Sequence, residues 1–96
     1  SDAQNAVLSY IRKGNNEKEN LVVVCNFTPV VRENYRIGVP SKGKLTELFN
    51  TDKKEYGGSG IGNPKAIKIE KEPWNGREHS VALILPPLSV TVFKIS

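Results

Sequence analysis

The glycine-rich stretch at residues 57–62 is the first place to look for chemistry, because it holds four of the chain's eight glycines. Such a turn binds phosphate when its backbone N–H groups point at the anion and a helix begins behind it. Here Asn63 and Pro64 follow, and then Ile67 and Ile69 alternate with charged residues at the period of a strand. The dinucleotide pattern G-x-G-x-x-G also fails, because Asn63 stands in its last position. We therefore predict a loop between strands.

Catalysis needs paired carboxylates, a nucleophile with its base, or a cluster of metal ligands. His79 is the only histidine, and no cysteines stand near it at the spacing of a metal site. Ser80 follows it without the glycine turn that exposes a catalytic serine. The acidic residues fall in predicted turns or on outward strand positions. We predict no catalytic, cofactor-binding or metal-binding residue in this chain.

The aromatic residues offer a second kind of chemistry, because sugar rings and nucleobases both stack on exposed flat side chains. Trp74 lies in the predicted turn "EPWNGRE", and Tyr56 stands at the head of the glycine-rich loop. These two are the candidates for contact with a sugar polymer, although a lone tryptophan in a small domain is often a core or edge residue. Tyr35 is in phase with Ile37 and Val39, so we predict that it belongs to the core.

Charge and hydropathy argue against two classes of partner. The net charge is +4, but lysines and glutamates alternate along residues 42–72, as on a solvated surface of mixed charge. The basic and aromatic residues do not interleave on a strand face, so nucleic-acid binding is not predicted. No apolar run approaches the roughly 20 residues that a membrane span requires.

The single cysteine excludes an internal disulfide framework, and nothing in the sequence demands an oxidising compartment. Cys25 lies in the apolar run "LVVVCNF" in phase with Leu21, Val23 and Phe27, so we predict that it is buried. The triplet Asn26-Phe27-Thr28 matches the glycosylation acceptor pattern, but it closes an apolar strand and is interpreted as a chance match.

The elements that must position these residues are short apolar segments, each bounded by turn residues. They fall at residues 6–12, 21–27, 35–39, 44–50, 66–72, 79–85 and 88–95. None shows the i, i+3, i+4, i+7 spacing of an amphipathic helix over more than one turn. The 21–27 segment is apolar in both phases and is predicted to be a central strand covered on both sides. The pattern predicts a single all-β domain, an antiparallel β-sandwich.

Three long stretches carry a resemblance to a known family. They are "VVVCNFTPVVRENYRIGVP" at 22–40, "ELFNTDKKEYGGSGIGN" at 47–63 and "WNGREHSVALILPPLSVTVFK" at 74–94. In order and spacing they resemble the C-terminal domain of bacterial-type 1,4-alpha-glucan branching enzymes, members of the alpha-amylase superfamily. The resemblance covers nearly the whole chain and implies a β-sandwich of Greek-key type.

The resemblance also implies the reaction of a parent enzyme in glycogen biosynthesis. An α-1,4 glucan segment is transferred to a 6-hydroxyl, making an α-1,6 branch, by a catalytic Asp and Glu on a preceding (β/α)8 barrel. Residues 1–96 would then be one accessory C-terminal domain of a larger cytoplasmic glycosyltransferase. Its expected partners are the barrel of the same polypeptide and, for the whole enzyme, α-glucan or glycogen. No catalytic residue transfers to any position of this chain.

Two functions remain open. In the first, the domain packs on the barrel and stabilises it, and the glycine-rich loop lies against the neighbouring surface. The residues of that loop are Gly57, Gly58, Ser59, Gly60, Ile61 and Gly62. In the second, the domain is a glucan-binding module that holds the polymer through Trp74 and Tyr56.

Overall fold

The structure, a computed structural model, describes residues 6–16 and 20–96. Over these residues the chain forms seven strands and one short 3-10 helix. They are β1 (Val7–Arg12), β2 (Leu21–Asn26), β3 (Arg32–Val39), β4 (Lys44–Asn50), η3 (Lys54–Tyr56), β5 (Ile67–Lys68), β6 (His79–Leu85) and β7 (Ser89–Ile95). Among the described residues no helix has the length and hydropathy of a membrane span.

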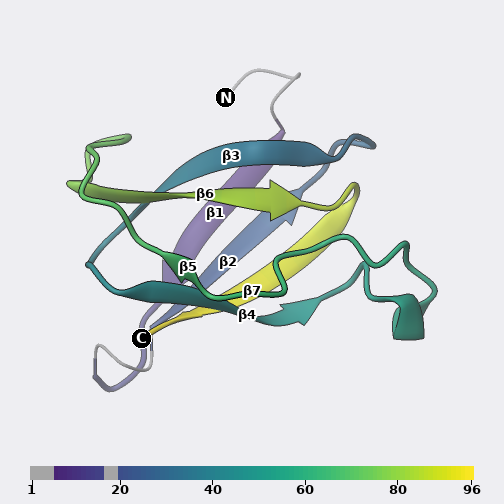
Figure 1. Cartoon of the computed structure of the whole chain (residues 1–96), viewed down its shortest axis with the longest axis horizontal. Coiled ribbons are helices and arrows are strands. Elements are labelled where there is room, and N and C mark those ends of the chain that lie inside the picture. The colour runs from purple at the N-terminus through teal and green to yellow at the C-terminus, as the bar shows by residue number, and fades with distance from the viewer. Residues whose placement is uncertain (1–5, 17–19) are drawn as a thin grey trace.

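The strands form two antiparallel sheets that face each other (Figure 1). Within the described ranges, the larger sheet has the order β1-β2-β7-β4-β5, and the smaller one pairs β3 with β6. The chain crosses to the small sheet after β2 and again after β5, and β7 returns to lie between β2 and β4. The predicted all-β sandwich of Greek-key type is confirmed.

The core lies between the sheets and uses one phase of each strand, because successive side chains of a strand point to opposite faces. From the large sheet come Val22, Val24 and Phe93, and each is fully buried. The whole cluster is Val22, Val24, Ile37, Val39, Leu45, Ile69, Val81, Leu83, Leu85, Phe93 and Ile95. Tyr35 is partly buried and packs against this cluster, close to its predicted place.

The prediction that Cys25 is buried is wrong. Cys25 is only partly buried, and Phe27, which continues its phase, is 59% exposed. Val22 and Val24 are the residues of β2 that face the core. Because the small sheet covers only one side of β2, the phase that carries Cys25 lies on the uncovered side of the large sheet.

Two strands, β3 and β5, differ from the prediction by more than one residue at an end. β3 begins at Arg32, inside the predicted turn, and its register with β6 shifts between Arg32 and Tyr35. Asn34 sits in this irregularity with φ 54°, a conformation that asparagine tolerates well. β5 is shorter than predicted, because the chain leaves β4 after Lys68 and runs to the small sheet, where Glu70 pairs with Ser80.

The turns after β2 and β6 are joined by a buried side chain. The amide nitrogen of Asn26 donates to the carbonyl oxygens of Val30 (3.0 Å) and Pro86 (2.9 Å). Its oxygen accepts from the backbone N–H (3.0 Å) and the hydroxyl (2.6 Å) of Thr28. Asn26 is 1% exposed, so its place in an acceptor triplet reflects this turn and not a modification site.

Candidate functional site

The glycine-rich loop turns its backbone N–H groups inward, onto Asp52. The carboxylate of Asp52 accepts from the hydroxyl of Ser59 (2.6 Å) and from the N–H groups of Ile61 (3.0 Å) and Ser59 (3.3 Å). The N–H of Gly60 donates to the carbonyl oxygen of Asp52 at 2.8 Å. The hydroxyl of Ser59 is the largest cause that holds the pKa of Asp52 below its ordinary value. Burial opposes it, and the N–H groups of Ile61, Ser59 and Gly60 each add a smaller lowering effect.

The start of the loop is closed in the same way. The N–H groups of Gly57 and Gly58 donate to the carbonyl oxygens of Lys54 (2.9 Å) and Lys53 (3.0 Å). A cradle for phosphate needs such groups directed at the ligand, but here they bind the chain's own carbonyls and a carboxylate that would repel an anion. These contacts support the prediction of a structural loop.

The end of the loop is anchored on β4 and β6 by two buried asparagines. The carboxylate of Glu47 accepts from the N–H of Asn63 (2.9 Å) and from the side-chain amide of Asn50 (3.3 Å). The side chain of Asn63 also bonds both the N–H (2.9 Å) and the carbonyl oxygen (2.8 Å) of Ile84. A Cβ on Gly62 would lie 2.6 Å from Nδ2 of Asn50, so only glycine lets the loop approach this closely.

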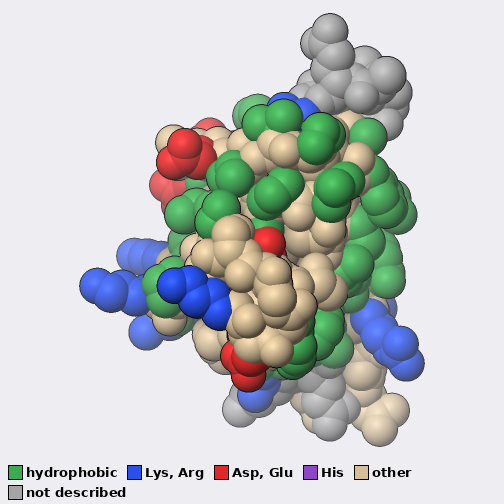
Figure 2. All heavy atoms as spheres, turned by 90° about the vertical axis from the view of Figure 1, so that its right-hand side faces the viewer, with side chains coloured by type: hydrophobic (Ala, Val, Ile, Leu, Met, Phe, Trp, Pro, Cys, Tyr) green, Lys and Arg blue, Asp and Glu red, His purple; other side chains and the backbone are tan. Residues whose placement is uncertain are grey.

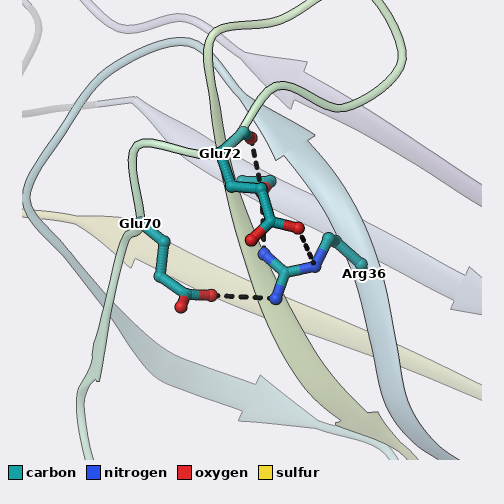
Figure 3. Close-up of polar contacts among 4 residues, drawn as sticks. Arg36, Glu70 and Glu72 are labelled. Carbon is teal, nitrogen blue, oxygen red and sulfur yellow. Dashed lines mark hydrogen bonds and ion pairs between the residues drawn. The ribbon is translucent and has the colours of Figure 1, made fainter.

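Arg36 holds the segment between β5 and β6 on the outside of the small sheet (Figure 3). Its guanidinium lies 2.9 Å from the carboxylate of Glu70 and 3.6 Å from that of Glu72. It also donates to the hydroxyl of Ser80 at 2.7 Å, and that hydroxyl donates to the carbonyl oxygen of Glu72 at 2.8 Å. The sequence carried no signal for this cluster, because its members lie on segments far apart in the chain.

Trp74 sits at the tip of a two-residue hairpin that lies over β3. Its N–H and carbonyl groups exchange hydrogen bonds with Arg77 at 2.9 Å and 3.1 Å. Asn75 and Gly76 between them have φ 49° and 79°, the two positive values that a type I′ turn requires. A Cβ on Gly38 would lie 2.6 Å from the carbonyl oxygen of Trp74, so glycine allows the tip to lie flat on the strand. The Asn-Gly pair was a readable signal for this turn.

The two candidate sugar-contact residues do not come together. Tyr56, in η3, lies against Phe49 with ring centroids 5.9 Å apart. Trp74 borders a hollow with Asn34 and Tyr35 beside β3. In Figure 1 the η3 turn lies at the lower right, whereas the tip of the segment between β5 and β6 lies at the upper left. One sugar chain cannot be held by both rings as a single site.

The uncovered side of the large sheet, which we call the outer face, carries two apolar rows. Pairing across the strands aligns Tyr10, Val23, Val92 and Phe49 in one row and Leu8, Cys25 and Val90 in the next. The large side chains Leu8, Tyr10 and Phe49 are 52%, 50% and 40% exposed. Figure 2 looks onto the end of the molecule with the glycine-rich loop, and hydrophobic side chains surround its upper part and continue down one side.

Comparison with known proteins places this sandwich in a family. Residues 1–96 match the family model described as alpha amylase, C-terminal all-beta domain. The chain belongs to the alpha-amylase C-terminal all-beta domain family.

Relatives of this C-terminal all-beta domain are named 1,4-alpha-glucan branching enzyme GlgB. The chain is 52% identical over 93 residues to the protein of Aquifex aeolicus, covering 97% of the chain and 15% of that relative. It is 49% identical over 92 residues to the protein of Rubrobacter xylanophilus, with 96% and 12% covered. It is 46% identical over 96 residues to the protein of Synechocystis sp., with 100% and 12% covered. The resemblance found in the sequence is confirmed, and the chain spans only 12–15% of these relatives.

The part of this all-beta domain that the structure describes contains no group of three His, Cys, Asp or Glu side chains arranged to hold a metal ion. His79 is partly buried at the start of β6, opposite Val39 of β3. The carboxylates of Glu47 and Asp52 are engaged by asparagine, serine and backbone groups of the loop. The arrangement is that of a structural network.

Proposed function

We propose that this chain is the accessory C-terminal domain of a 1,4-alpha-glucan branching enzyme, where it packs on the catalytic barrel and stabilises it. The branching chemistry, transfer of an α-1,4 segment to a 6-hydroxyl of glycogen, belongs to the barrel. The chain alone is therefore expected neither to cleave nor to branch an α-1,4 glucan. We expect the enzyme to work in the cytoplasm.

The observation that supports this proposal most directly is the outer face. An apolar surface that spans four strands and carries three half-exposed large side chains is typical of a face that a partner covers. Fully burying a large apolar side chain contributes about 1.5–3 kcal/mol. Covering Leu8, Tyr10 and Phe49, each already about half buried, would stabilise the docked domain by roughly 3 kcal/mol.

The glycine-rich loop borders this face through the contact of Tyr56 with Phe49. We therefore propose that residues 57–62 lie at the rim of the interface with the barrel. Phe27 and Leu88 extend the apolar surface at the same end, and both are mostly exposed. Since the N–H groups of residues 57–61 are already engaged, the contribution of this segment would be shape and not new backbone hydrogen bonds.

The test compares one substitution on the outer face with one on the opposite sheet. Leu8→Lys alters the outer face, and Ile84→Lys alters a residue of β6 that is 37% exposed. Each variant removes the buried part of an apolar side chain and should lower the stability of the 96-residue chain by about 1 kcal/mol. In the full-length enzyme, Leu8→Lys should lower the midpoint of thermal unfolding by a few degrees more than Ile84→Lys does.

Docking through the outer face would be refuted if Leu8→Lys and Ile84→Lys lowered the unfolding midpoint of the full-length enzyme by the same amount. A larger loss for Ile84→Lys would instead assign the barrel contact to the side of the small sheet.

A further inference from the structure

Resting on the proposed function for its ligand class, we propose that the hollow beside Trp74 is a glucan-contact site, in which one glucose ring of an α-1,4 chain stacks on the indole. The hollow has a volume of about 640 Å³, within the range of small-molecule sites. The side chains that carry the argument are Trp74, Asn75, Glu33, Asn34, Tyr35 and Arg36.

The chemistry of these side chains matches a sugar ring. A pyranose has an apolar face of C–H groups and a rim of hydroxyls, and the half-exposed indole of Trp74 offers the matching flat apolar surface. The amides of Asn34 and Asn75 each provide donors and an acceptor, and Glu33 adds a carboxylate. Hydroxyls both donate and accept, so this mixture can satisfy neighbouring hydroxyls of one ring.

The charges around the hollow favour a neutral ligand. Arg36 is already bonded to Glu70 and Glu72, and these two carboxylates outnumber it. On the lining, Glu33 and Arg32 carry opposite charges, so these five groups together sum to −1. A phosphate or nucleic-acid strand would meet no net electrostatic attraction here. An uncharged polyhydroxyl chain does not depend on such attraction.

The tip that carries Trp74 is rigid before any ligand arrives. Both of its cross-strand hydrogen bonds are made, its turn residues hold the required positive φ values, and Gly38 allows it to rest directly on β3. The Arg36 cluster fixes the segment that leads into it (Figure 3). A preorganised platform lowers the entropy cost of binding a flexible polymer.

The site stays accessible when the domain is docked. Gly38, on which the tip rests, lies on the side of β3 that faces away from the core, because its neighbours Ile37 and Val39 face inward. The outer face proposed for the barrel belongs to the other sheet. The domain can thus contact the barrel through the large sheet and a glucan chain through the tip over the small sheet, and Tyr10 and Asn75 both line a second hollow at the edge between these two surfaces.

The experiment is a titration of the ¹⁵N-labelled 96-residue chain with maltoheptaose, followed by amide and indole N–H chemical shifts. We expect saturable shifts at the indole of Trp74 and the side-chain amides of Asn34 and Asn75, with a dissociation constant in the millimolar range. Trp74→Ala should weaken binding about tenfold or more, because the stacking surface is lost. Trp74→Phe keeps a smaller ring and should bind with intermediate affinity.

The matched control is Tyr56→Ala, which removes the other exposed ring of the candidate pair and should leave binding unchanged. Sorbitol has hydroxyls without a ring face and should give no saturable shift. Shifts that cluster away from Trp74, binding indifferent to Trp74→Ala, or saturation by sorbitol would overturn the proposal. If the spectrum of Trp74→Ala loses its dispersion and so shows an unfolded variant, the proposal is tested by the affinity of Trp74→Phe and by the residues whose shifts change in the unchanged chain. Because the barrel is absent from this titration, its outcome is separate from that of the docking test.

Discussion

Asn26 is the residue whose replacement tests the packing of this sandwich most severely. Its four hydrogen bonds tie the turn after β2 to the turn after β6, and its side chain is 1% exposed. A typical hydrogen bond contributes about 0.5–1.5 kcal/mol net, and a buried group left without a partner costs about 1–3 kcal/mol. After Asn26→Ala, the carbonyl oxygen of Pro86 still accepts from the hydroxyl of Ser89, but the N–H of Thr28 loses its acceptor, Oδ1 of Asn26. We expect Asn26→Ala to lower the free energy of unfolding by about 3 kcal/mol.

Asn26→Asp makes the test more specific, because it keeps the shape of the side chain and replaces the donating amide nitrogen by an oxygen. The new oxygen would face the carbonyl oxygens of Val30 and Pro86, to which the amide nitrogen now donates. Burial and these carbonyls raise the pKa of the introduced carboxyl above its unfolded value of about 3.9. The unfolded chain then releases this proton more readily, so the stability lost relative to Asn26 grows as pH rises above about 4, by up to roughly 1.4 kcal/mol per pH unit.

The assay is urea unfolding of the 96-residue chain, followed by far-ultraviolet circular dichroism at about pH 4 and about pH 7. The control is Asn34→Asp, because Asn34 is exposed and both residue types tolerate its positive φ. Asn34→Asp should lose little stability toward urea at either pH. An Asn26→Asp variant that loses the same stability at both pH values, or an Asn26→Ala variant within about 1 kcal/mol of the unchanged chain, would refute the assigned contacts.

Two further predictions concern Asp52 and the Arg36 cluster. Because the folded pKa of Asp52 lies below its ordinary 3.8, its carboxylate stabilises the fold above about pH 4, and that stability is lost as pH falls through the lowered pKa. Asp52→Asn should therefore lower the free energy of unfolding by at most about 1 kcal/mol near neutral pH. In urea unfolding, this difference from the unchanged chain should become smaller below about pH 4. A difference that stays constant with pH would contradict the role of Ser59 and the loop N–H groups. Arg36→Met should lower the free energy of unfolding by about 1–2 kcal/mol and speed hydrogen exchange at the backbone amides of Glu70 and Ser80. Arg36→Lys should not restore the slow exchange, because an ammonium group cannot replace the fork of the guanidinium. Unchanged exchange at these amides would show that the Arg36 cluster is dispensable.

Two sheet faces of this domain are suited to different neighbours. The outer face is apolar across four strands, and the far side of the small sheet presents Trp74, on a hydrogen-bonded turn, beside amides and a carboxylate. Apolar surfaces of the first kind gain from being covered, whereas the second kind keeps its polar groups hydrated until a polyhydroxyl ligand replaces water. The two proposals are therefore compatible within one enzyme.

The sequence alone determined the all-β class, the bounds of two strands and the family. Strands β4 and β6 begin and end where the alternating pattern predicted, because one covered face imposes a period of two. Residues 22–94 carried motifs long enough to identify the domain, and the comparisons agree. The glycine-rich loop was recognised as a loop because a strand, and not a helix, follows it.

Only the tertiary structure decided which side of β2 is covered and which residues meet. Both phases of β2 are apolar, so alternation could not tell that Val22 and Val24 face the core while Cys25 faces out. The topology, and not spacing in the chain, brings Arg36 to Glu70 and sends Trp74 and Tyr56 to opposite ends. Contacts between distant segments depend on how the two sheets stack, and that arrangement leaves no local pattern in the sequence.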